Sequence, residues 1–373
     1  MRIAFDARPL LGHRTGVSVW LEGLLRGLAA ATDWRFVLCL PRAASSLGVD
    51  DLGERCELLA PVVGLPGTVW LHTVAAPMAE GRADAWVGTL GVLPRRLAMP
   101  AVLAVHDLTP RSRPRQHTPA NRFCFNAYFE ESAARADAVV CVSAATRSAL
   151  ASVLSQVASR AEVIREGVDV FFAPAHDVGE GSETARRFAD GRRFLVQLGT
   201  LEPRKGIATL LAAHAALLRA DPAAPDLVLA GAPGWGGGWL ERALAAHPDR
   251  SRVHLPGYVS REDARALLRH AELVVLASDE EGFGLPLAEA LACGAACVVS
   301  DAAALLEVAA GAARVFPRGD AAALAEALAA ALRPDERERL RAAARGRAGL
   351  LGWAEPLAAW QRLLVRVAAP PRA

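Results

Sequence analysis

The most unusual residue in this sequence is a lysine. Lys205, in the stretch TLEPRKGIAT, is the only lysine among 42 cationic side chains, and the others are arginines. It lies between Arg204 and Gly206, in a turn that follows an apolar run. An ammonium is a compact point charge with three rotatable donors, whereas a guanidinium is a wide planar fork. A crowded site would accommodate the ammonium more readily, so the lysine is a candidate for a functional role. The alternative is codon drift that spared one residue.

A second stretch carries a glycine-rich loop. In SDEEGFGLPLAEALACG (278–294), glycines flank Phe283, and Pro286 is suited to the first position of a helix, where its missing N–H is not needed. The amides of Phe283, Gly284 and Leu285 would then lie at a helix N-terminus, which carries roughly half a positive charge and binds phosphate groups. The loop is therefore a candidate phosphate-binding site.

Two glutamates accompany this loop. Glu281 directly precedes it, and Glu289 is expected in the first turn of the helix that follows. Glu281 could be a solvated loop acid, and Glu289 could serve only the helix dipole. Beside a phosphate-binding loop, both are also candidates for contacting the rest of a ligand.

Two places in the N-terminal half could also face a ligand. The stretch AVHDLTP puts His106 and Asp107 after an apolar run, where they either cap the next turn or meet a ligand. The turn DARPLLGHRTGVSVW contains Gly12 and Gly16. These glycines either allow a positive φ or bring the backbone close to a ligand at a helix N-terminus.

Short apolar runs alternate with longer amphipathic segments, which predicts βαβ units on parallel sheets. Strands buried on both faces should read as continuously apolar, as these runs do. Strands are predicted at 2–7, 36–40, 85–90, 101–107, 138–143, 162–167, 194–199, 226–231, 252–257, 272–277, 296–301 and 313–317, and clear helices at 17–31 and 121–135.

The expected fold is α/β, with two doubly wound Rossmann-like domains facing a central cleft. A chain of 373 residues is long enough for two domains. The polar segment 173–192 is predicted to be a linker between domains 1–172 and 193–354. A helix at about 355–370 is expected to pack back on the first domain. Ligands of such sheets bind beyond the carboxyl ends of the strands.

Composition excludes several classes of protein. A net charge of +2 and ordinary hydrophobicity fit neither a nucleic-acid-binding protein nor a disordered chain. The six cysteines lack CxxC spacing and read as small buried hydrophobes in a reducing compartment. No histidine spacing indicates a metal site, so neither a metal nor another cofactor is expected. Without a signal peptide or a long apolar stretch, a cytoplasmic location is expected.

The combined pattern resembles a known enzyme family. The motif E-G-F-G-L-P-x-x-E is similar to the signature of retaining family 4 glycosyltransferases of the GT-B fold. GTLEPRKG, LAGAPGW, LPGYVSRED and VVSDAAALLEVA follow in the family order, and HDLTP, RADAVVCVS and GVD match in the N-terminal half. The pattern is most similar to mannosyltransferase-like members that build bacterial polysaccharides.

The resemblance implies an activity and partners. It implies retaining transfer of a hexose, with mannose favoured, from a nucleotide-diphosphate sugar to an acceptor hydroxyl. GDP-mannose is the favoured donor, the first domain binds the acceptor, and the acceptor is a glycan or a lipid-linked glycan. A sugar-nucleotide epimerase of the same fold, or a non-catalytic protein that binds a nucleotide sugar, stay as alternatives.

The resemblance also implies roles for individual residues. Arg204 and Lys205, with the loop amides, would stabilise the leaving diphosphate. Glu289 would hold the ribose hydroxyls, Glu281 would contact the donor sugar, and His106 would reach that sugar from the first domain. Gly16 and Thr200 would complete the donor site.

The sequence departs from the family pattern at several positions. Thr200 stands where arginine is frequent, Glu166 replaces the usual asparagine before GVD, and Leu306 replaces a proline. Glu280 occupies a position that is often aromatic, and it adds negative charge near the donor sugar.

A group of arginines in N-terminal loops is expected either to meet anionic lipid headgroups or to be simply solvated. The group comprises Arg95, Arg96, Arg111, Arg113 and Arg115.

Overall fold

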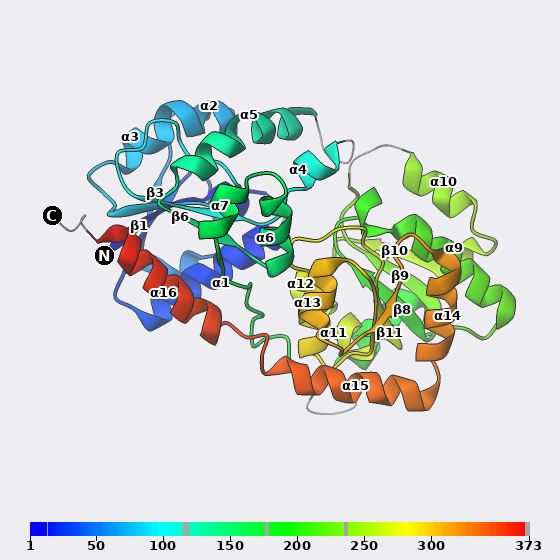
Figure 1. The fold of residues 1–373 in the computed structure, drawn as a ribbon. Coiled ribbons are helices and arrows are strands. Elements are labelled where there is room, and N and C mark those ends of the chain that lie inside the picture. The colour runs from blue at the N-terminus through cyan, green and yellow to red at the C-terminus, as the bar shows by residue number, and fades with distance from the viewer. Residues whose placement is uncertain (13, 115–118, 176–178, 235–237, 370–373) are drawn as a thin grey trace. The chain divides into compact units, whose positions relative to one another are not determined.

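The computed structural model describes residues 1–12, 14–114, 119–175, 179–234 and 238–369 (Figure 1). The chain divides into two compact units. Unit 1 consists of Met1–Gly167 together with Trp353–Ala373, and unit 2 is Val168–Gly352. Each unit is built on a sheet whose strand pairings are all parallel.

The sheet of unit 1 has the strand order β3-β2-β1-β4-β5-β6-β7. Its strands are β1 (Arg2–Asp6), β2 (Arg35–Cys39), β3 (Cys56–Leu59), β4 (Ala85–Gly88), β5 (Ala101–Val105), β6 (Ala138–Cys141) and β7 (Glu162–Val163). The strand order changes direction between β1 and β4. Strands β2 and β3 are added on one side of β1, and the later strands are added on the other side. Ligands of doubly wound sheets bind at such a switch point.

Helices cover both faces of this sheet. Trp20 and its neighbours on α1 (Gly16–Ala31) share one core with Trp360 on α16 (Ala354–Ala368) and with Ile3 and Phe5 of β1. The opposite face packs against Trp70 and other buried side chains. Leu10 of η1 (Arg8–Leu10) and Leu52 of η2 (Asp50–Arg55) pack in the first core, with α1 and α16. The other helical segments of unit 1 include α2 (Gly67–Trp70), the π-helix η3 (Leu71–Ala75), α3 (Ala76–Ala79), α4 (Thr109–Ser112), α5 (Pro119–Arg135), α6 (Ala144–Ala151) and α7 (Ser155–Arg160).

The sheet of unit 2 has the order β10-β9-β8-β11-β12-β13. Its strands are β8 (Phe194–Leu198), β9 (Asp226–Ala230), β10 (Val253–Gly257), β11 (Leu273–Leu276), β12 (Cys297–Ser300) and β13 (Arg314–Phe316). Its helical segments are α8 (Ser182–Arg186), η5 (Arg187–Ala189), η6 (Pro203–Lys205), α9 (Ile207–Ala220), α10 (Trp239–Ala245), η7 (Arg250–Arg252), α11 (Arg261–His270), α12 (Leu285–Ala292), α13 (Ala303–Ala309), α14 (Ala321–Ala331) and α15 (Pro334–Ala348).

Every strand predicted from an apolar run is present, and each end lies within four residues of its predicted position. Strand β3 was missed. It lies at the edge of its sheet, and Leu58 is 49% exposed. An edge strand need not be apolar on both faces, so it leaves no continuous apolar run in the sequence.

The segment predicted as a linker, 173–192, contains regular structure. Residues 182–189 form α8 and η5 inside unit 2, and the division between the units falls at Gly167 rather than at residue 172. Arg187 is paired with Asp263 at 2.6 Å, and Ala185 and Ala189 are buried. Polar composition alone did not distinguish a short surface helix from a linker. Residues 176–178 lie outside the described part of the chain.

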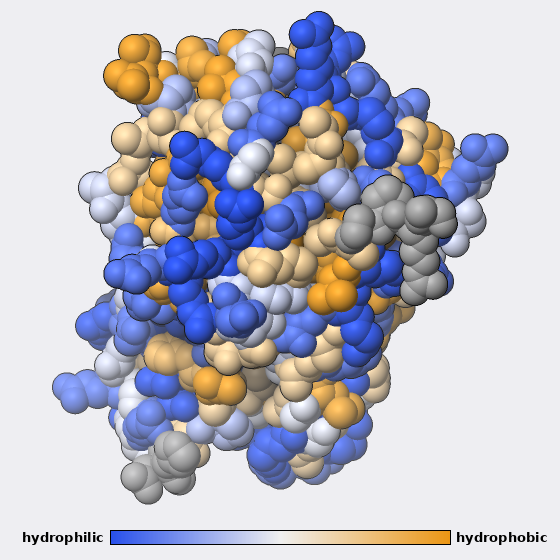
Figure 2. Space-filling model, turned by 90° about the vertical axis from the view of Figure 1, so that its left-hand side faces the viewer, coloured by the Kyte–Doolittle hydropathy of each residue, from blue (hydrophilic) through white to orange (hydrophobic). Residues whose placement is uncertain are grey.

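The surface is mainly hydrophilic on the face shown in Figure 2, where hydrophobic groups are scattered among hydrophilic residues. Scattered surface hydrophobes of this kind are normal for globular proteins. Among the described residues, no helix has the length and apolar character needed to cross a membrane.

Candidate functional site

The lysine turn joins β8 to α9 at the carboxyl edge of the second sheet. Gly199 follows the strand with a φ of +126°, η6 carries the lysine, and Gly206 caps α9 with a φ of +66°. A Cβ on Gly206 would lie 1.9 Å from the carbonyl oxygen of Ala277, just after β11. Glycine is therefore required here both by the conformation and by the close approach of the neighbouring backbone.

The lysine turn and the glycine-rich loop are joined directly. The backbone amide of Asp279 donates to the carbonyl oxygen of Arg204 at 2.8 Å. The side-chain amide of Gln197, on β8, donates to the carbonyl oxygen of Lys205 at 3.1 Å. These hydrogen bonds fix the cationic residues of η6 relative to both strands.

The glycine-rich loop leads into α12, as predicted. Gly284 caps the helix with a φ of +98°, and a Cβ there would lie 2.8 Å from Leu305. Leu285 is the first helical residue, so Pro286 takes the second position rather than the predicted first. The first amides of a helix have no partner within it. This end of α12 can therefore donate to an anion.

Glu281 binds both cations of the turn. Its carboxylate accepts from Lys205 Nζ at 2.6 Å and from Arg204 Nη1 at 3.3 Å. It also accepts from the hydroxyl of Ser278 at 2.7 Å. The side chains of Glu281, Lys205 and Arg204 are only 7%, 12% and 15% exposed. Arg204 is held from its other side by Glu202, at 2.8 Å. The predicted site residues of this edge thus form one ion-pair cluster.

Two opposing effects set the pKa of Glu281. Burial by itself would raise it, because a charged carboxylate is poorly solvated there. The charges of Lys205 and Arg204, with hydrogen bonds from Lys205 and Ser278, outweigh burial and lower the pKa to about 2. Glu281 is therefore ionised at neutral pH and balances one of the two cations beside the helix end.

Glu289 and Thr200 lie in the same unit. Glu289 is the fifth residue of α12, beyond the first turn in which it was expected, because the helix starts one residue earlier than the proline placement suggested. The helix dipole acts mainly within the first turn, so dipole complementation alone explains Glu289 less well. Thr200 is partly exposed, directly after Gly199.

His106 and Gly16 belong to unit 1 instead. His106 follows β5, and its Nδ1 lies 3.0 Å from Glu166 Oε1. Gly16 is the first residue of α1, which Thr15 caps through a reciprocal hydrogen-bond pair with Ser18. Asp107, weighed as a ligand contact, instead accepts from the amide and hydroxyl of Thr109 and so caps the next turn.

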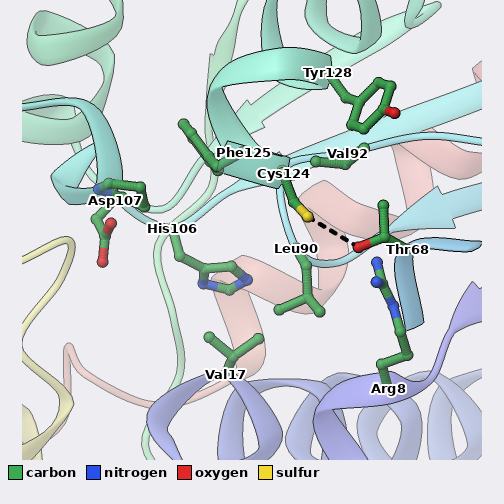
Figure 3. Close-up of a pocket in the computed structure, with 12 residues that line it drawn as sticks. Arg8, Val17, Thr68, Leu90, Val92, His106, Asp107, Cys124, Phe125 and Tyr128 are labelled. Atoms are coloured by element: carbon green, nitrogen blue, oxygen red, sulfur yellow. Dashed lines mark hydrogen bonds between the residues drawn. The ribbon is translucent and has the colours of Figure 1, made fainter. Parts of the chain in front are cut away.

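Unit 1 contains a pocket of about 380 Å³ next to His106 (Figure 3). Figure 3 shows the imidazole next to Val17 and Leu90, with Arg8 on the other side of the pocket. Arg8 is paired with the buried carboxylate of Asp6, its Nη2 lying 2.6 Å from Oδ2. The remaining lining residues are Thr68, Gly91, Val92, Asp107, Pro110, Cys124, Phe125 and Tyr128.

Sequence reasoning missed several residues of these sites. Glu202, Ser278, Arg8 and Asp6 lie in the quoted stretches but were not singled out, because their own types and spacing show no pattern within them. Glu166 was noted only as a departure, yet it contacts a predicted site residue.

The two parallel Rossmann-like units and the ion-pair cluster beside a helix N-terminus fit a glycosyltransferase of the GT-B fold, and comparison with known proteins agrees. Residues 179–347 match the model of the group 1 glycosyl transferases, and residues 15–172 match that of glycosyltransferase family 4. The chain belongs to the group 1, family 4 glycosyltransferases. The family and the fold expected from the motifs are confirmed.

Two relatives act on mannose, according to their names. O-antigen chain mannosyltransferase B of Escherichia coli is 28% identical over 367 residues, which span 93% of this chain and 94% of that protein. GDP-mannose:cellobiosyl-diphosphopolyprenol alpha-mannosyltransferase of Xanthomonas oryzae pv. oryzae is 30% identical over 143 residues. That shorter match covers 38% of this chain and 35% of that protein.

A solved structure supports the fold. The crystal structure of Anabaena Alr3699/HepE in complex with UDP-glucose superposes with a TM-score of 0.76, over 98% of this chain and 100% of that one. The two sequences are 18% identical, so this likeness extends to the fold alone.

Proposed function

We propose that this glycosyltransferase moves a mannosyl group from GDP-mannose to a hydroxyl of a growing bacterial polysaccharide or glycolipid, with retention of configuration. One observation carries the choice of sugar, the similarity to a mannosyltransferase along 93% of the chain. A second relative, similar over a shorter range, is named for GDP-mannose as well as for mannosyl transfer.

The cluster in unit 2 supports the chemistry of this proposal. Lys205 and Arg204, with the first amides of α12, would bind the diphosphate of the donor. Negative charge on the diphosphate grows as its bond to the sugar breaks, and preorganised cations stabilise that charge. Glu281 would contact the sugar, Glu289 the ribose hydroxyls. With the N–H donors of these two side chains and of the helix end to bind the diphosphate, we propose that no metal is required.

The state of Glu281 favours a front-face reaction over a covalent glycosyl-enzyme. Double displacement needs a carboxylate free to attack the anomeric carbon, whereas this carboxylate is held by two cations and a hydroxyl. In the front-face step, the bond from the anomeric carbon to the phosphate oxygen breaks. The acceptor oxygen bonds to the same face of that carbon, and the acceptor proton passes to the departing phosphate oxygen.

Product analysis tests the proposal. The full-length protein is incubated with GDP-mannose and mannose-terminated oligosaccharides in the presence of EDTA, with UDP-glucose as the control donor. We expect release of GDP and a new α-mannosidic linkage by NMR, without UDP from the control. A β-linked product would overturn retention, and activity only with UDP-glucose would overturn the donor. An altered sugar nucleotide without acceptor would identify an epimerase, and donor binding without turnover a sensor.

Contact with anionic membrane stays a separate proposal. Arg111 is paired with Glu130, and Arg95 lies 3.7 Å from Glu131, so part of the expected basic group is already neutralised. Arg115 lies outside the described residues. Sedimentation with vesicles of increasing anionic lipid content tests this proposal. If the bound fraction of the protein does not depend on the anionic lipid content, the proposal is wrong.

A further inference from the structure

His106 makes an asymmetric set of contacts in unit 1. Its Nδ1 lies 3.0 Å from the carboxylate of Glu166, which is 6% exposed. Its other ring nitrogen, Nε2, is buried and has no hydrogen-bond partner among the described residues. The imidazole as a whole lines the pocket shown in Figure 3. A buried ring nitrogen without a partner is costly unless a ligand satisfies it.

The neighbourhood holds this ring in place from several sides. Trp20, itself fully buried, packs edge to face against the imidazole with centroids 4.6 Å apart. The hydroxyl of Thr146 donates to the backbone carbonyl of His106 at 3.1 Å. Gly167, the residue after Glu166, approaches Trp353 so closely that a Cβ would lie 2.4 Å from its ring. That contact fixes the backbone from which the Glu166 carboxylate extends.

The carboxylate decides which ring nitrogen carries the proton. An ionised carboxylate only accepts hydrogen bonds, so Nδ1 must donate and therefore bears the hydrogen. In the neutral ring, Nε2 then holds a lone pair. In other enzymes, a carboxylate that accepts from one ring nitrogen of a histidine orients the ring and fixes its tautomer in this way.

We infer that Glu166 is a positioning residue that fixes His106 as the Nδ1–H tautomer, so that Nε2 accepts a hydrogen bond from a hydroxyl of the bound sugar substrate. The identity of that ligand rests on the proposed function, whereas the tautomer does not. Among the other groups at the pocket, the charge of Arg8 is matched by Asp6, and Asp107 accepts hydrogen bonds from the uncharged amide and hydroxyl of Thr109. Because Asp107 adds a carboxylate and Arg8 is already paired, an uncharged, hydroxyl-bearing ligand fits the pocket better than an anionic one.

The tautomer can be measured directly by nitrogen-15 NMR of the full-length protein labelled at histidine, with His106→Gln used to assign the signals. We expect the neutral imidazole to carry its proton on Nδ1. In Glu166→Met, which keeps the length of the side chain but removes the acceptor, the proton should move to Nε2. Glu166→Gln keeps an oxygen that can accept, so it should retain the original tautomer.

Kinetics supply the second measurement. We expect Glu166→Met to lower kcat/KM for transfer about tenfold, as loss of a partner that orients a functional histidine does elsewhere, and Glu166→Gln to restore most of it. Glu162→Met is the matched control on the same segment, because the Glu162 side chain is 44% exposed and is paired with Arg366 rather than with His106. We expect it to leave both readouts unchanged.

Two results would overturn the inference. One is a wild-type imidazole with its proton on Nε2, which needs no variant to fold. The other is a tautomer that is the same in the wild type and in folded Glu166→Met. If no transfer is found with any donor, the proposed function fails, while the NMR result still decides the role of Glu166.

Discussion

At the scale of single residues, the lone lysine forms a short ion pair with Glu281. Lys205 Nζ and Glu281 Oε1 lie 2.6 Å apart in a largely buried cluster. An ammonium has three donors, so it can keep its bond to Glu281 and still donate to a phosphate oxygen. The sequence suggested that a compact cation is needed at this position. In the structure, the ammonium lies in a largely buried cluster where one small group can donate to two partners.

Replacing Lys205 tests this reason. We expect Lys205→Ala to lower turnover on the order of a hundredfold, the cost of removing one oxyanion donor in other enzymes. Lys205→Arg should fall between, because the planar guanidinium cannot meet Glu281 and a diphosphate with the same geometry. The loss should appear in kcat as well as in the donor KM, since leaving-group charge grows in the transition state.

Steady-state kinetics on both lysine variants decide the matter. If Lys205→Arg matches the wild type in kcat and in KM, the rarity of the lysine has no functional meaning, and codon drift explains it.

Glu289 carries a prediction about the donor. If its carboxylate accepts hydrogen bonds from ribose, Glu289→Gln should weaken binding of GDP-mannose, while a 2'-deoxyribose donor should suffer little further from the mutation. Titration calorimetry with both donors measures this. If Glu289→Gln lowers the affinity for the 2'-deoxyribose donor as much as the affinity for GDP-mannose, the assignment is contradicted.

Glu281 makes stability depend on acid pH. Its pKa falls from an ordinary 4.5 to about 2 in the folded protein. A lowered pKa means that its stabilising contribution is complete above about pH 4.5 and is lost as the pH falls toward 2. Denaturant unfolding between pH 6 and pH 2.5 should show this loss, and Glu281→Gln should flatten that part of the profile. A profile that the mutation leaves unchanged would show that other carboxylates control acid unfolding.

At the scale of elements, the turn between β8 and α9 depends on close backbone packing. Gly206→Ala would place a Cβ 1.9 Å from the carbonyl oxygen of Ala277 at a positive φ, so the turn must move. We expect a loss of several kcal/mol, because a positive φ alone costs roughly 1–2 kcal/mol for alanine and the clash adds to it. Urea unfolding measures the change.

Gly311→Ala is the matched control for this turn. Its φ is +87°, and a Cβ there would meet nothing within 4 Å. This variant therefore isolates the conformational cost. If both variants lose the same free energy, the close approach at Gly206 contributes nothing.

At the scale of the whole molecule, the chain leaves unit 1 and returns to it. Unit 2 occupies Val168–Gly352, and its two ends are joined, with the amide of Val168 donating to the carbonyl of Leu351 at 2.8 Å. Helix α16 belongs to unit 1 (Figure 1). Its residues Trp360, Leu363 and Leu364 are fully buried in the core of that unit. Unit 2 is built like an inserted domain with adjacent termini.

This arrangement predicts unequal behaviour of two fragments. Residues 168–352 alone should unfold cooperatively, because both sheet and core are complete. A chain ending at residue 352 should lose the structure of unit 1, since removing even one buried tryptophan or leucine costs roughly 2–5 kcal/mol. Circular dichroism and thermal unfolding of both fragments measure this. A truncated chain with two intact transitions would show that α16 is dispensable.

Much of this molecule follows from local sequence. Strand positions were readable because strands buried on both faces, such as β5 and β8, must be continuously apolar. The lysine turn and the glycine-rich loop were readable because a helix N-terminus needs particular residues at fixed spacing. The expected meeting of Lys205 with the loop after β11 followed from parallel strands, whose carboxyl ends share one edge.

Tertiary structure alone decided the contacts between residues far apart in the chain. Glu166 lies 60 positions from His106, and Lys205 lies 76 from Glu281. Neither spacing has a periodicity that a sequence can display. The edge strand β3 and helix α8 were also invisible, since partly exposed elements need no distinctive composition. Local backbone preferences and burial leave patterns between neighbouring residues of the sequence. The pairing of distant side chains arises only when each sheet brings the ends of its strands together.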